Sequence, residues 1–328
     1  MKQNLNAVEH KKMVWKYIFT LSLAKSSSRY LKHAYIPYRN LTEFTNDLSV
    51  KWSSRSHWCG TLRECNVGEE VHLTGWVQYF RLDNKFVLLR DASGVVQLIL
   101  PEEGVIADCV REKIKEIGPE SSIKAIGTVI QRPKGQCNPS LDTGMVEVDV
   151  KDIAFVNPAI KSLPFLPSRV TNEGKEPLRM KHRSLDLRRQ ELQNNLRLRS
   201  KVVMNIRQFL CKYGFIDIET PTLFRRTPGG AREFIVPTRL KGKFYSLVQS
   251  PQQFKQMLMV GGFDKYFQIA RCYRDEGAKP DRQPEFTQVD IEMSWCNRSG
   301  IQDCIEELLR YSWPEHLHTE LSDKGSPG

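Results

Sequence analysis

The chain of 328 residues carries 49 Lys and Arg against 38 Asp and Glu, a formal net charge of +11, and 40% of its residues are hydrophobic. This length and apolar content are typical of a globular protein with two or three domains, and no run reaches the eighteen or so apolar residues that a membrane-spanning helix needs. The eight cysteines form no CxxC pair and no cluster with zinc-ligand spacing, which favours reduced thiols over a disulfide framework.

The first residues form a basic leader. Residues 1–42 hold eight Lys and Arg but a single acid, Glu9, together with a run of three serines. A basic, hydroxyl-bearing and acid-poor composition is typical of an organellar transit peptide, although a disordered basic extension that binds RNA weakly has the same composition. We predict that residues 1–58 comprise a transit peptide and a flexible N-terminal segment.

The next region, residues 59–156, is rich in β-forming runs. The expected strands span residues 71–80, 86–90, 95–100, 122–130 and 145–150. A helix is expected at residues 106–117, between the third strand and the fourth. Five strands with a helix at that place are the plan of the OB-fold, which binds single-stranded nucleic acid across its second and third strands.

Aromatic and basic residues lie on or beside these two strands. Phe86 lies on the second strand and Gln97 on the third, and Phe80, Arg81 and Arg90 complete a mixed face. Such a face stacks bases on its rings and attracts phosphates. The alternative is that Phe86 belongs to the barrel core, as most strand phenylalanines do.

A proline-rich linker then leads into a long helix. Residues 157–178 contain four prolines. A basic segment, residues 159–207, begins in this linker and holds twelve Lys and Arg against four Asp and Glu. A basic linker can lie against an RNA backbone, or it can be simply solvated. Residues 188–213 repeat apolar side chains at helical spacing and end before Gly214. A strand that ends at Pro221 follows.

Two features after this strand have the chemistry of a ligand site. Gly229 and Gly230 make residues 227–238 a conformationally free loop. Gln252 and Lys255 are three residues apart in a predicted helix and therefore share one face. The ammonium of Lys255 can pair with a carboxylate ligand, or it can be a solvated group on an amphipathic helix.

The central prediction is a hairpin made by residues 266–274 and 286–295. Antiparallel pairing brings Arg274 and Glu276, at the end of the first strand, close to Phe286 at the start of the second. A guanidinium can clamp a phosphate, a carboxylate can accept a hydrogen bond from an exocyclic amine, and an aromatic ring can stack on a base. These groups predict a nucleotide site without a P-loop, against the alternative of a solvated loop with surface ion pairs.

The string RDEGAKPDRQPEFTQVDIEMS, which begins at Arg274, resembles motif 2 of class II aminoacyl-tRNA synthetases, in the form found in bacterial and organellar aspartyl enzymes. The helix and strand that end at Pro221 resemble motif 1, the dimer interface, and SPQQFKQ around Lys255 resembles the aspartate-binding helix. The strings GWV, FVLLRD and GVVQLI resemble the anticodon-binding domain of aspartyl-, asparaginyl- and lysyl-tRNA synthetases.

This resemblance implies a two-domain α+β fold, with an N-terminal OB-fold barrel followed by a truncated class II antiparallel sheet flanked by helices. It implies catalytic roles for Arg274 and Glu276. The ATP-binding positions it implies are Arg274, Asp275, Glu276, Gln283 and Phe286. The aspartate-binding positions are Gln252, Lys255, Arg274 and Gly229, which stands where bacterial members usually carry Glu. The anticodon-binding positions are Phe86, Gln97 and Arg81, and the dimer-interface residue is Pro221.

The function implied is aspartate–tRNA ligase activity in the mitochondrial matrix, with ATP, L-aspartate and tRNA-Asp as substrates, Mg²⁺ as cofactor, a homodimeric assembly and no membrane. The resemblance covers roughly residues 59–313; residues 179–313 match a catalytic domain with motifs 1 and 2 but without motif 3, and 314–328 are expected to be a disordered tail. The expectation is an incomplete N-terminal part that does not charge tRNA alone, with the Mg²⁺ ligands in the missing part and no metal ligand in this chain. A non-catalytic tRNA-binding or dimer-forming fragment and a sister enzyme for asparagine or lysine remain the alternatives.

Overall fold

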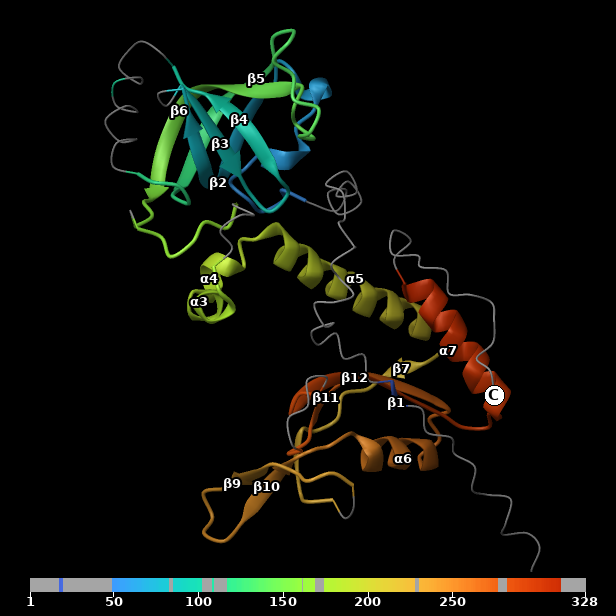
Figure 1. Ribbon diagram of the computed structural model, residues 1–328. Helices are drawn as coiled ribbons and strands as arrows, with labels where there is room; N and C mark the ends of the chain where they lie inside the picture. The colour runs from blue at the N-terminus through green and yellow to red at the C-terminus, as the bar shows by residue number, and fades with distance from the viewer. Residues whose placement is uncertain are drawn as a thin grey trace, which may run out of the picture. The chain divides into compact units, whose positions relative to one another are not determined.

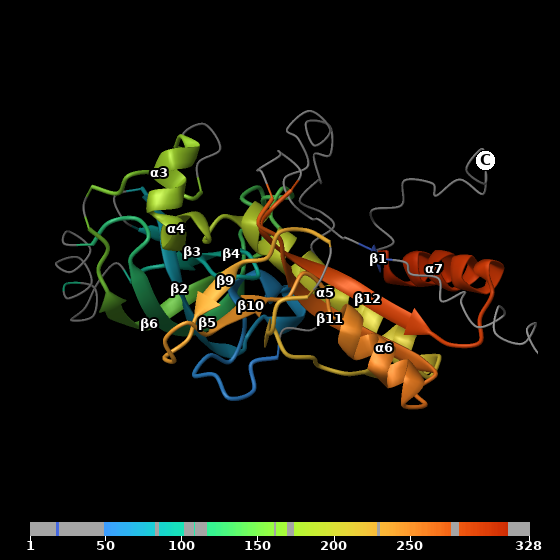
Figure 2. The same ribbon diagram turned by 90° about the horizontal axis from the view of Figure 1, so that it is seen from below.

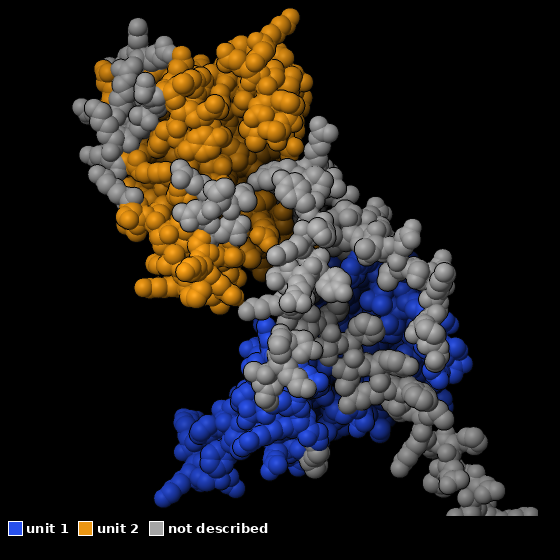
Figure 3. Space-filling view, viewed as in Figure 1, with its two compact units in different colours: residues 1–35, 199–328 blue, residues 36–198 orange. Residues whose placement is uncertain are grey.

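The computed structural model describes residues 18–19, 49–82, 85–101, 108, 117–160, 162–168, 174–227, 230–276 and 282–313. Apart from residues 18–19, the predicted transit peptide lies outside the described residues. Nearly all of the helix expected at 106–117, Gly229 and the tail 314–328 also lie outside them. The chain forms two compact units, Ile36–Leu198 and the combination of Met1–Tyr35 with Arg199–Gly328 (Figure 3).

The unit Ile36–Leu198 contains a closed five-stranded barrel (Figure 1). Its strands are β2 (Glu70–Arg81), β3 (Phe86–Arg90), β4 (Val95–Ile99), β5 (Ser122–Gln131) and β6 (Val146–Asn157). They follow the order β2-β3-β4-β6-β5, with β4 parallel to β6 and the other neighbours antiparallel. This topology confirms the OB-like barrel that the sequence predicted.

Alternation along the strands sends one set of side chains into the barrel. These side chains form one apolar core, whose fully or almost fully buried members include Val71, Leu73, Val77, Leu89, Leu98 and Val148. Burying each such side chain contributes about 1.5–3 kcal/mol to stability. Two short 3-10 helices, η3 (Cys59–Thr61) and η4 (Glu64–Asn66), lead into β2.

A buried ion-pair cluster occupies the end of β3. Arg90 donates two hydrogen bonds to the carboxylate of Glu120, at 2.6 and 2.8 Å, and both side chains are buried. Arg188 donates to the same carboxylate at 3.0 Å, and its guanidinium lies 4.6 Å from the ring centroid of Trp76. The prediction that Arg90 joins an exposed nucleic-acid face is therefore wrong, because this guanidinium neutralises a buried acid.

Two short helices, α3 (Glu176–Lys181) and α4 (Arg183–Asp186), follow the irregular linker and precede the long helix α5 (Gln190–Lys212). Helix α5 ends as its sequence predicted. Gly214 has φ +80°, the amide of Phe215 donates to the carbonyl of Leu210, and the amide of Gly214 donates to that of Cys211. These two bonds form a Schellman cap, whose left-handed position is usually occupied by glycine.

The second unit is built on the predicted hairpin. Strands β11 (Lys265–Tyr273) and β12 (Glu285–Met293) pair antiparallel over their whole length. Strand β7 (Ile216–Asp217) is parallel to β11 at one edge, and β1 (Ile18–Phe19) pairs with β12 at the other. A smaller sheet contains β8 (Leu223–Phe224), β10 (Phe244–Leu247) and β9 (Ile235–Pro237), in that order.

The two faces of the hairpin differ in chemistry and in the helices that cover them. Helices α5 and α7 (Arg298–Ser312) lie on one face and α6 (Gln252–Val260) lies on the other (Figures 1 and 2). The face toward α5 and α7 is apolar, with Phe209, Leu210, Phe267, Val289, Ile291 and Leu308 in one core cluster. The face toward α6 carries buried polar side chains, among them Tyr266, Gln288, Asp290 and Glu292.

Helix α7 begins with a side-chain cap, because Asn297 Oδ1 accepts a hydrogen bond from the amide of Gly300 at 2.8 Å. Within the described part of the chain, none of the helices combines the length and the apolar character needed to cross a membrane.

Candidate functional site

The predicted nucleotide-binding residues lie where β11 ends and β12 begins. Tyr273, the last residue of β11, pairs with Glu285, and the amide of Arg274 donates to the carbonyl of Pro284 at 2.9 Å. The guanidinium carbon of Arg274 lies 5.0 Å from the ring centroid of Phe286. The antiparallel pairing thus brings Arg274 and Phe286 together, as the sequence predicted.

Arg274 has unused hydrogen-bonding capacity. Its Nε is buried and has no hydrogen-bond partner among the described residues. Glu276, two residues later, and Gln283 are exposed, and a carboxylate oxygen of Glu276 lies 3.7 Å from the guanidinium of Arg282. Because a buried donor without an acceptor costs about 1–3 kcal/mol, this guanidinium is suited to an incoming anion.

A second cluster lies on the same strand pair, beneath α6. The ammonium of Lys255 is 2.5 Å from Asp290 Oδ1 and 3.1 Å from Glu292 Oε2, and all three side chains are fully buried. The alternative of a solvated lysine is therefore wrong. The sequence analysis missed Asp290 and Glu292, although their alternation with Phe286 and Gln288 on one strand face was a usable signal.

This cluster contains one lysine and two acids, and the Lys255 ammonium lies within ion-pair distance of a carboxylate oxygen of each acid. The neighbouring Gln252 presents a buried Oε1 that accepts no hydrogen bond from the described residues. Buried charge is tolerated only when it is paired and hydrogen-bonded. A ligand that brings an ammonium group could donate to the unused acceptor of Gln252 beside these acidic side chains.

Neutral donors complete this face. The thiol of Cys272 donates to Gln288 Oε1 at 3.1 Å, and the hydroxyl of Tyr266 donates to Gln268 Oε1 at 2.8 Å. Burial, followed by the charge of Asp290, raises the pKa of Cys272 to about 12. The same two causes raise the pKa of Tyr266 well above its ordinary value. Both groups therefore stay protonated and act as hydrogen-bond donors at neutral pH.

The barrel presents the predicted nucleic-acid residues on one face of β3 and β4. Phe86 is opposite Ile99 and Leu88 is opposite Gln97, so Phe86 and Gln97 are diagonal neighbours on the same face. Phe86 is half-buried and Arg81 is exposed.

Two residues that the sequence analysis did not name belong to this face. Gln97 Nε2 donates to the buried carboxylate of Glu147 at 2.8 Å. The ammonium of Lys85 lies 5.9 Å from the centroid of the Phe86 ring. Glu147 fixes the orientation of the Gln97 amide, while Lys85 adds a cation beside the half-exposed ring.

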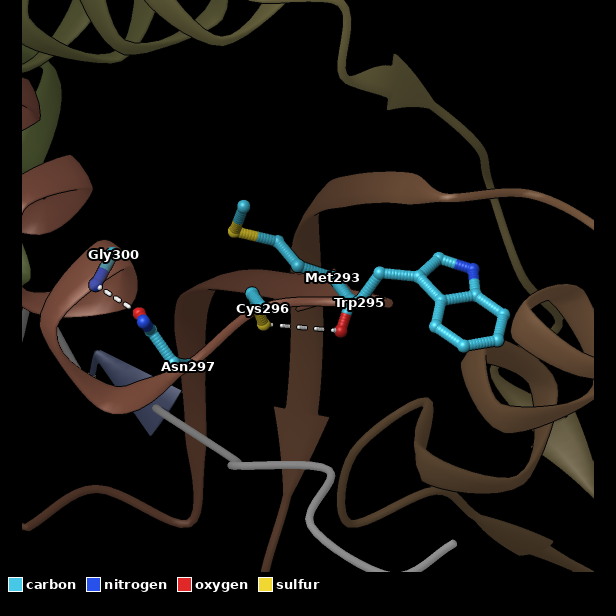
Figure 4. A pocket seen from close by; sticks show the side chains of 5 residues that line it. All are labelled: Met293, Trp295, Cys296, Asn297 and Gly300. Carbon is cyan, nitrogen blue, oxygen red and sulfur yellow. Dashed lines mark hydrogen bonds between the residues drawn. The ribbon is translucent and has the colours of Figure 1, made fainter.

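The remaining predicted positions are placed as follows. Pro221 is exposed between β7 and β8, and Gly229 lies outside the described residues. In the described ranges, no three His, Cys, Asp or Glu side chains are grouped so that they could hold a metal ion. A pocket beyond the end of β12 is lined by Met293, Trp295, Cys296, Asn297 and Gly300, none of which is a predicted site residue (Figure 4).

Comparisons with known proteins relate the sequence and the fold to one family of enzymes. Residues 175–324 match the family model of class II tRNA synthetases of the D, K and N type. The chain is 54% identical over 281 residues to the mitochondrial aspartate–tRNA ligase of Homo sapiens, covering 84% of this chain and 43% of that protein. It is 48% identical over 277 residues to an aspartate–tRNA(Asp/Asn) ligase of Dictyoglomus turgidum, with 82% and 45% covered.

Among solved structures, the asparaginyl-tRNA synthetase of Pyrococcus horikoshii complexed with asparaginyl-adenylate has the same fold, with a TM-score of 0.66, 24% identity, and 78% of this chain and 57% of that chain covered. The chain spans less than half the length of the two curated relatives described above, with 43% and 45% of them covered. On these grounds the chain is a homologue of the mitochondrial aspartate–tRNA ligases and carries the class II synthetase fold.

Proposed function

We propose that this protein takes part in the ATP-dependent attachment of L-aspartate to tRNA-Asp. In the first step the aspartate α-carboxylate attacks the α-phosphate of ATP, which forms aspartyl-adenylate and releases pyrophosphate. In the second step a terminal ribose hydroxyl of the tRNA takes the aspartyl group. The observation that carries the proposal is the buried Lys255–Asp290–Glu292 cluster on the polar face of the hairpin whose first strand ends just before Arg274.

The residues at the end of the hairpin would each bind a different part of ATP. Arg274 supplies an unsatisfied guanidinium for the α-phosphate and for the aspartate carboxylate. Phe286 would offer its ring to the adenine, and the exposed Glu276 would accept from the adenine amine. Asp275 and Gln283 would add further contacts to the nucleotide. No protein nucleophile is required, because positioning and charge neutralisation supply the catalysis.

The cluster beneath α6 would select the amino acid. Asp290 and Gln252 Oε1 fit the substrate ammonium, since one brings negative charge and the other an unused acceptor. Lys255 has three N–H donors, of which two face carboxylates, so the third can meet the side-chain carboxylate of aspartate. Glu292 holds Lys255 in place. Gly229 stands where bacterial members usually carry Glu, and glycine has no side chain to meet the ammonium.

Mg²⁺ accompanies ATP in the proposed reaction as a charge-neutralising ion. The described residues offer it no cluster of acidic ligands, and the nearest buried acids, Asp290 and Glu292, are paired with Lys255. No step of the reaction is therefore assigned to a metal held by these residues.

The barrel would read the anticodon of tRNA-Asp. Phe86 is half-buried, so one side of its ring can stack on a base, and Gln97 is held by Glu147 for hydrogen bonding to a base edge. Arg81 and Lys85 place positive charge beside the ring. Pro221, exposed after β7, would contact a second subunit in a homodimer.

The direct test is the incorporation of labelled pyrophosphate into ATP, measured separately with L-aspartate, L-asparagine and L-lysine, by this chain joined to the remaining residues of a homologous mitochondrial aspartate–tRNA ligase. Exchange that depends on L-aspartate supports the proposal, and exchange with asparagine or lysine would assign the chain to a sister enzyme. Binding of tRNA-Asp without any exchange would favour a non-catalytic RNA-binding form, which the intact barrel allows.

The proposed location is the mitochondrial matrix, supported by the basic, acid-poor composition of residues 1–42 and by relatives that are mitochondrial enzymes. Fusion of these residues to a fluorescent reporter tests it. A reporter that stays in the cytosol would contradict the proposal.

A further inference from the structure

Residues 230–233, called here the arc, are tied to two other segments of the second unit. The amide of Ala231 donates to Gln249 Oε1 at 2.7 Å, and Gln249 Nε2 donates to Glu233 Oε1 at 3.3 Å. The carboxylate of Glu233 also accepts from the amide and the hydroxyl of Thr227. The side chain of Gln249 thus contacts both ends of the arc. Gln249 lies just before helix α6, which carries Gln252 and Lys255.

The geometry of the arc depends on Gly230. Its φ of +87° is in the left-handed region, and a Cβ there would lie 2.4 Å from Gln249 Oε1. The left-handed φ favours glycine, and a Cβ would displace the end of the Gln249 side chain from this contact. Gly230 therefore leaves room for the hydrogen bond between Ala231 and Gln249, which joins the arc to the segment before α6.

The other side of the arc contacts the turn that carries the ATP-site residues. The amide of Asp275 donates to the carbonyl of Arg232 at 2.8 Å, and Arg232 Nε lies 3.7 Å from Asp275 Oδ2. Asp275 stands between Arg274 and Glu276. The amide of Tyr273 donates to the carbonyl of Val248 at 3.1 Å, so the same strand end also touches the residue before Gln249.

From these contacts we infer that aspartate binding and ATP binding are thermodynamically coupled, and that Gln249 is the positioning residue that couples them. The inference rests on the proposed function, which assigns ATP to the turn 274–276 and aspartate to the face beneath α6. A ligand that orders the turn also orders the arc, because both share the Arg232–Asp275 bond. Conversely, a ligand that orders the arc and α6 also orders residues 274–276. Each ligand then removes part of the ordering cost of the other, which is positive and reciprocal coupling.

Calorimetric titration of the full chain measures this coupling. The affinity for α,β-methylene-ATP, whose α–β bond the reaction does not cleave, is determined with and without saturating L-aspartate. We expect L-aspartate to tighten the binding of the analogue about 5-fold or more. In Gln249→Ala that factor should fall to less than 2-fold. Gln256→Ala, an exposed glutamine on α6, is the matched control and should retain the wild-type factor.

Amide hydrogen exchange on the wild-type chain provides a readout that needs no variant. L-Aspartate alone should slow exchange of the Asp275 amide, and the ATP analogue alone should slow exchange of the Ala231 amide, each by at least about 3-fold. This measurement decides the question should Gln249→Ala fail to fold. If both ligands bind but the affinity factor and both amides are unaffected, the coupling is refuted while the proposed function stands. If neither ligand binds the wild-type chain, the proposed function and the coupling both fail.

Discussion

The ammonium of Lys255 lies 2.5 Å from a carboxylate oxygen of Asp290, and neither side chain is exposed to solvent. The two residues are 35 positions apart, on helix α6 and strand β12. Their pairing fixes α6 against the polar face of the hairpin. A stabilising contact of this kind can also select a ligand, because any group entering the site must be compatible with its charges.

The first prediction concerns the stability that this pair provides. Lys255→Met removes the ammonium that pairs with the buried carboxylates of Asp290 and Glu292. Loss of one partner of a buried ion pair costs about 3–5 kcal/mol. Urea denaturation of the purified chain measures the change. Lys241→Met, an exposed lysine, is the matched control and should change the free energy of unfolding by less than about 0.5 kcal/mol; an equally small loss in Lys255→Met would contradict the assignment.

The second prediction concerns the nucleotide site. Arg274→Ala should weaken ATP binding by about 1.5–3 kcal/mol, roughly 10- to 100-fold in Kd, the range for a hydrogen bond to a charged group. Arg274→Lys should not restore it, because an ammonium lacks the planar two-donor geometry of a guanidinium. The control is Arg271→Ala, which lies three residues earlier on the strand and pairs with Glu285 at the surface. Titration calorimetry gives both affinities, and equal losses in the two alanine variants would assign only a general charge effect to Arg274.

The third prediction concerns the barrel. Phe86→Ala should weaken binding of a tRNA-Asp anticodon stem-loop by about 1–3 kcal/mol, the range for one base stacked on an aromatic ring. Gln97→Ala should lower the preference for the cognate central anticodon base over a replaced base. Fluorescence anisotropy with both stem-loops measures affinity and preference. A Phe86→Ala variant that binds both RNAs like wild type would mean that the ring serves only the core.

The fourth prediction uses the raised pKa of Cys272. Because burial raises this pKa to about 12, almost no thiolate is present at pH 8, and the thiolate is the form that reacts with iodoacetamide. The exposed Cys65 and Cys211 should therefore be alkylated in the native chain before Cys272, as peptide mass spectrometry can determine. Rapid modification of Cys272 at pH 8 would show that the polar face is open to solvent.

The same pKa has a consequence for stability. The unfolded thiol has the ordinary value of 9.0, so above that pH the unfolded chain loses a proton that the folded chain retains. The contribution of Cys272 is present below about pH 9 and is lost as the pH rises toward 12. A Cys272→Ala variant should show a weaker decline in stability over this pH range than the wild-type chain.

Much of the fold was predictable because its signals are local. In the barrel and the hairpin, the strands are indicated by the alternation of apolar and polar side chains. The end of α5 is indicated by the glycine that follows it. Both signals depend only on residues close together in sequence. The position of Arg274 beside Phe286 was also predictable, since antiparallel pairing brings strand ends together whatever their loop contains.

The roles of other residues depend on partners distant in sequence, and these were missed. Arg90 looks like a surface cation on its strand, but Glu120, thirty residues later, buries it as an ion pair. Lys255 looks like a solvated helix residue until Asp290 and Glu292 are placed beneath it. Sequence periodicity shows which face of an element is apolar, but it does not identify which charges meet across two elements.

The measurement that tests the account most directly is calorimetric titration of the chain with L-aspartate, L-asparagine and L-lysine. The site described here contains Lys255 and Arg274 for the carboxylates and Asp290 with Gln252 for the ammonium. The account predicts that L-aspartate binds at least about 10-fold more tightly than L-asparagine, a difference of about 1.4 kcal/mol, and that Gln252→Ala weakens this binding. Binding of L-asparagine or L-lysine as tight as that of L-aspartate, or no binding of L-aspartate, would contradict it.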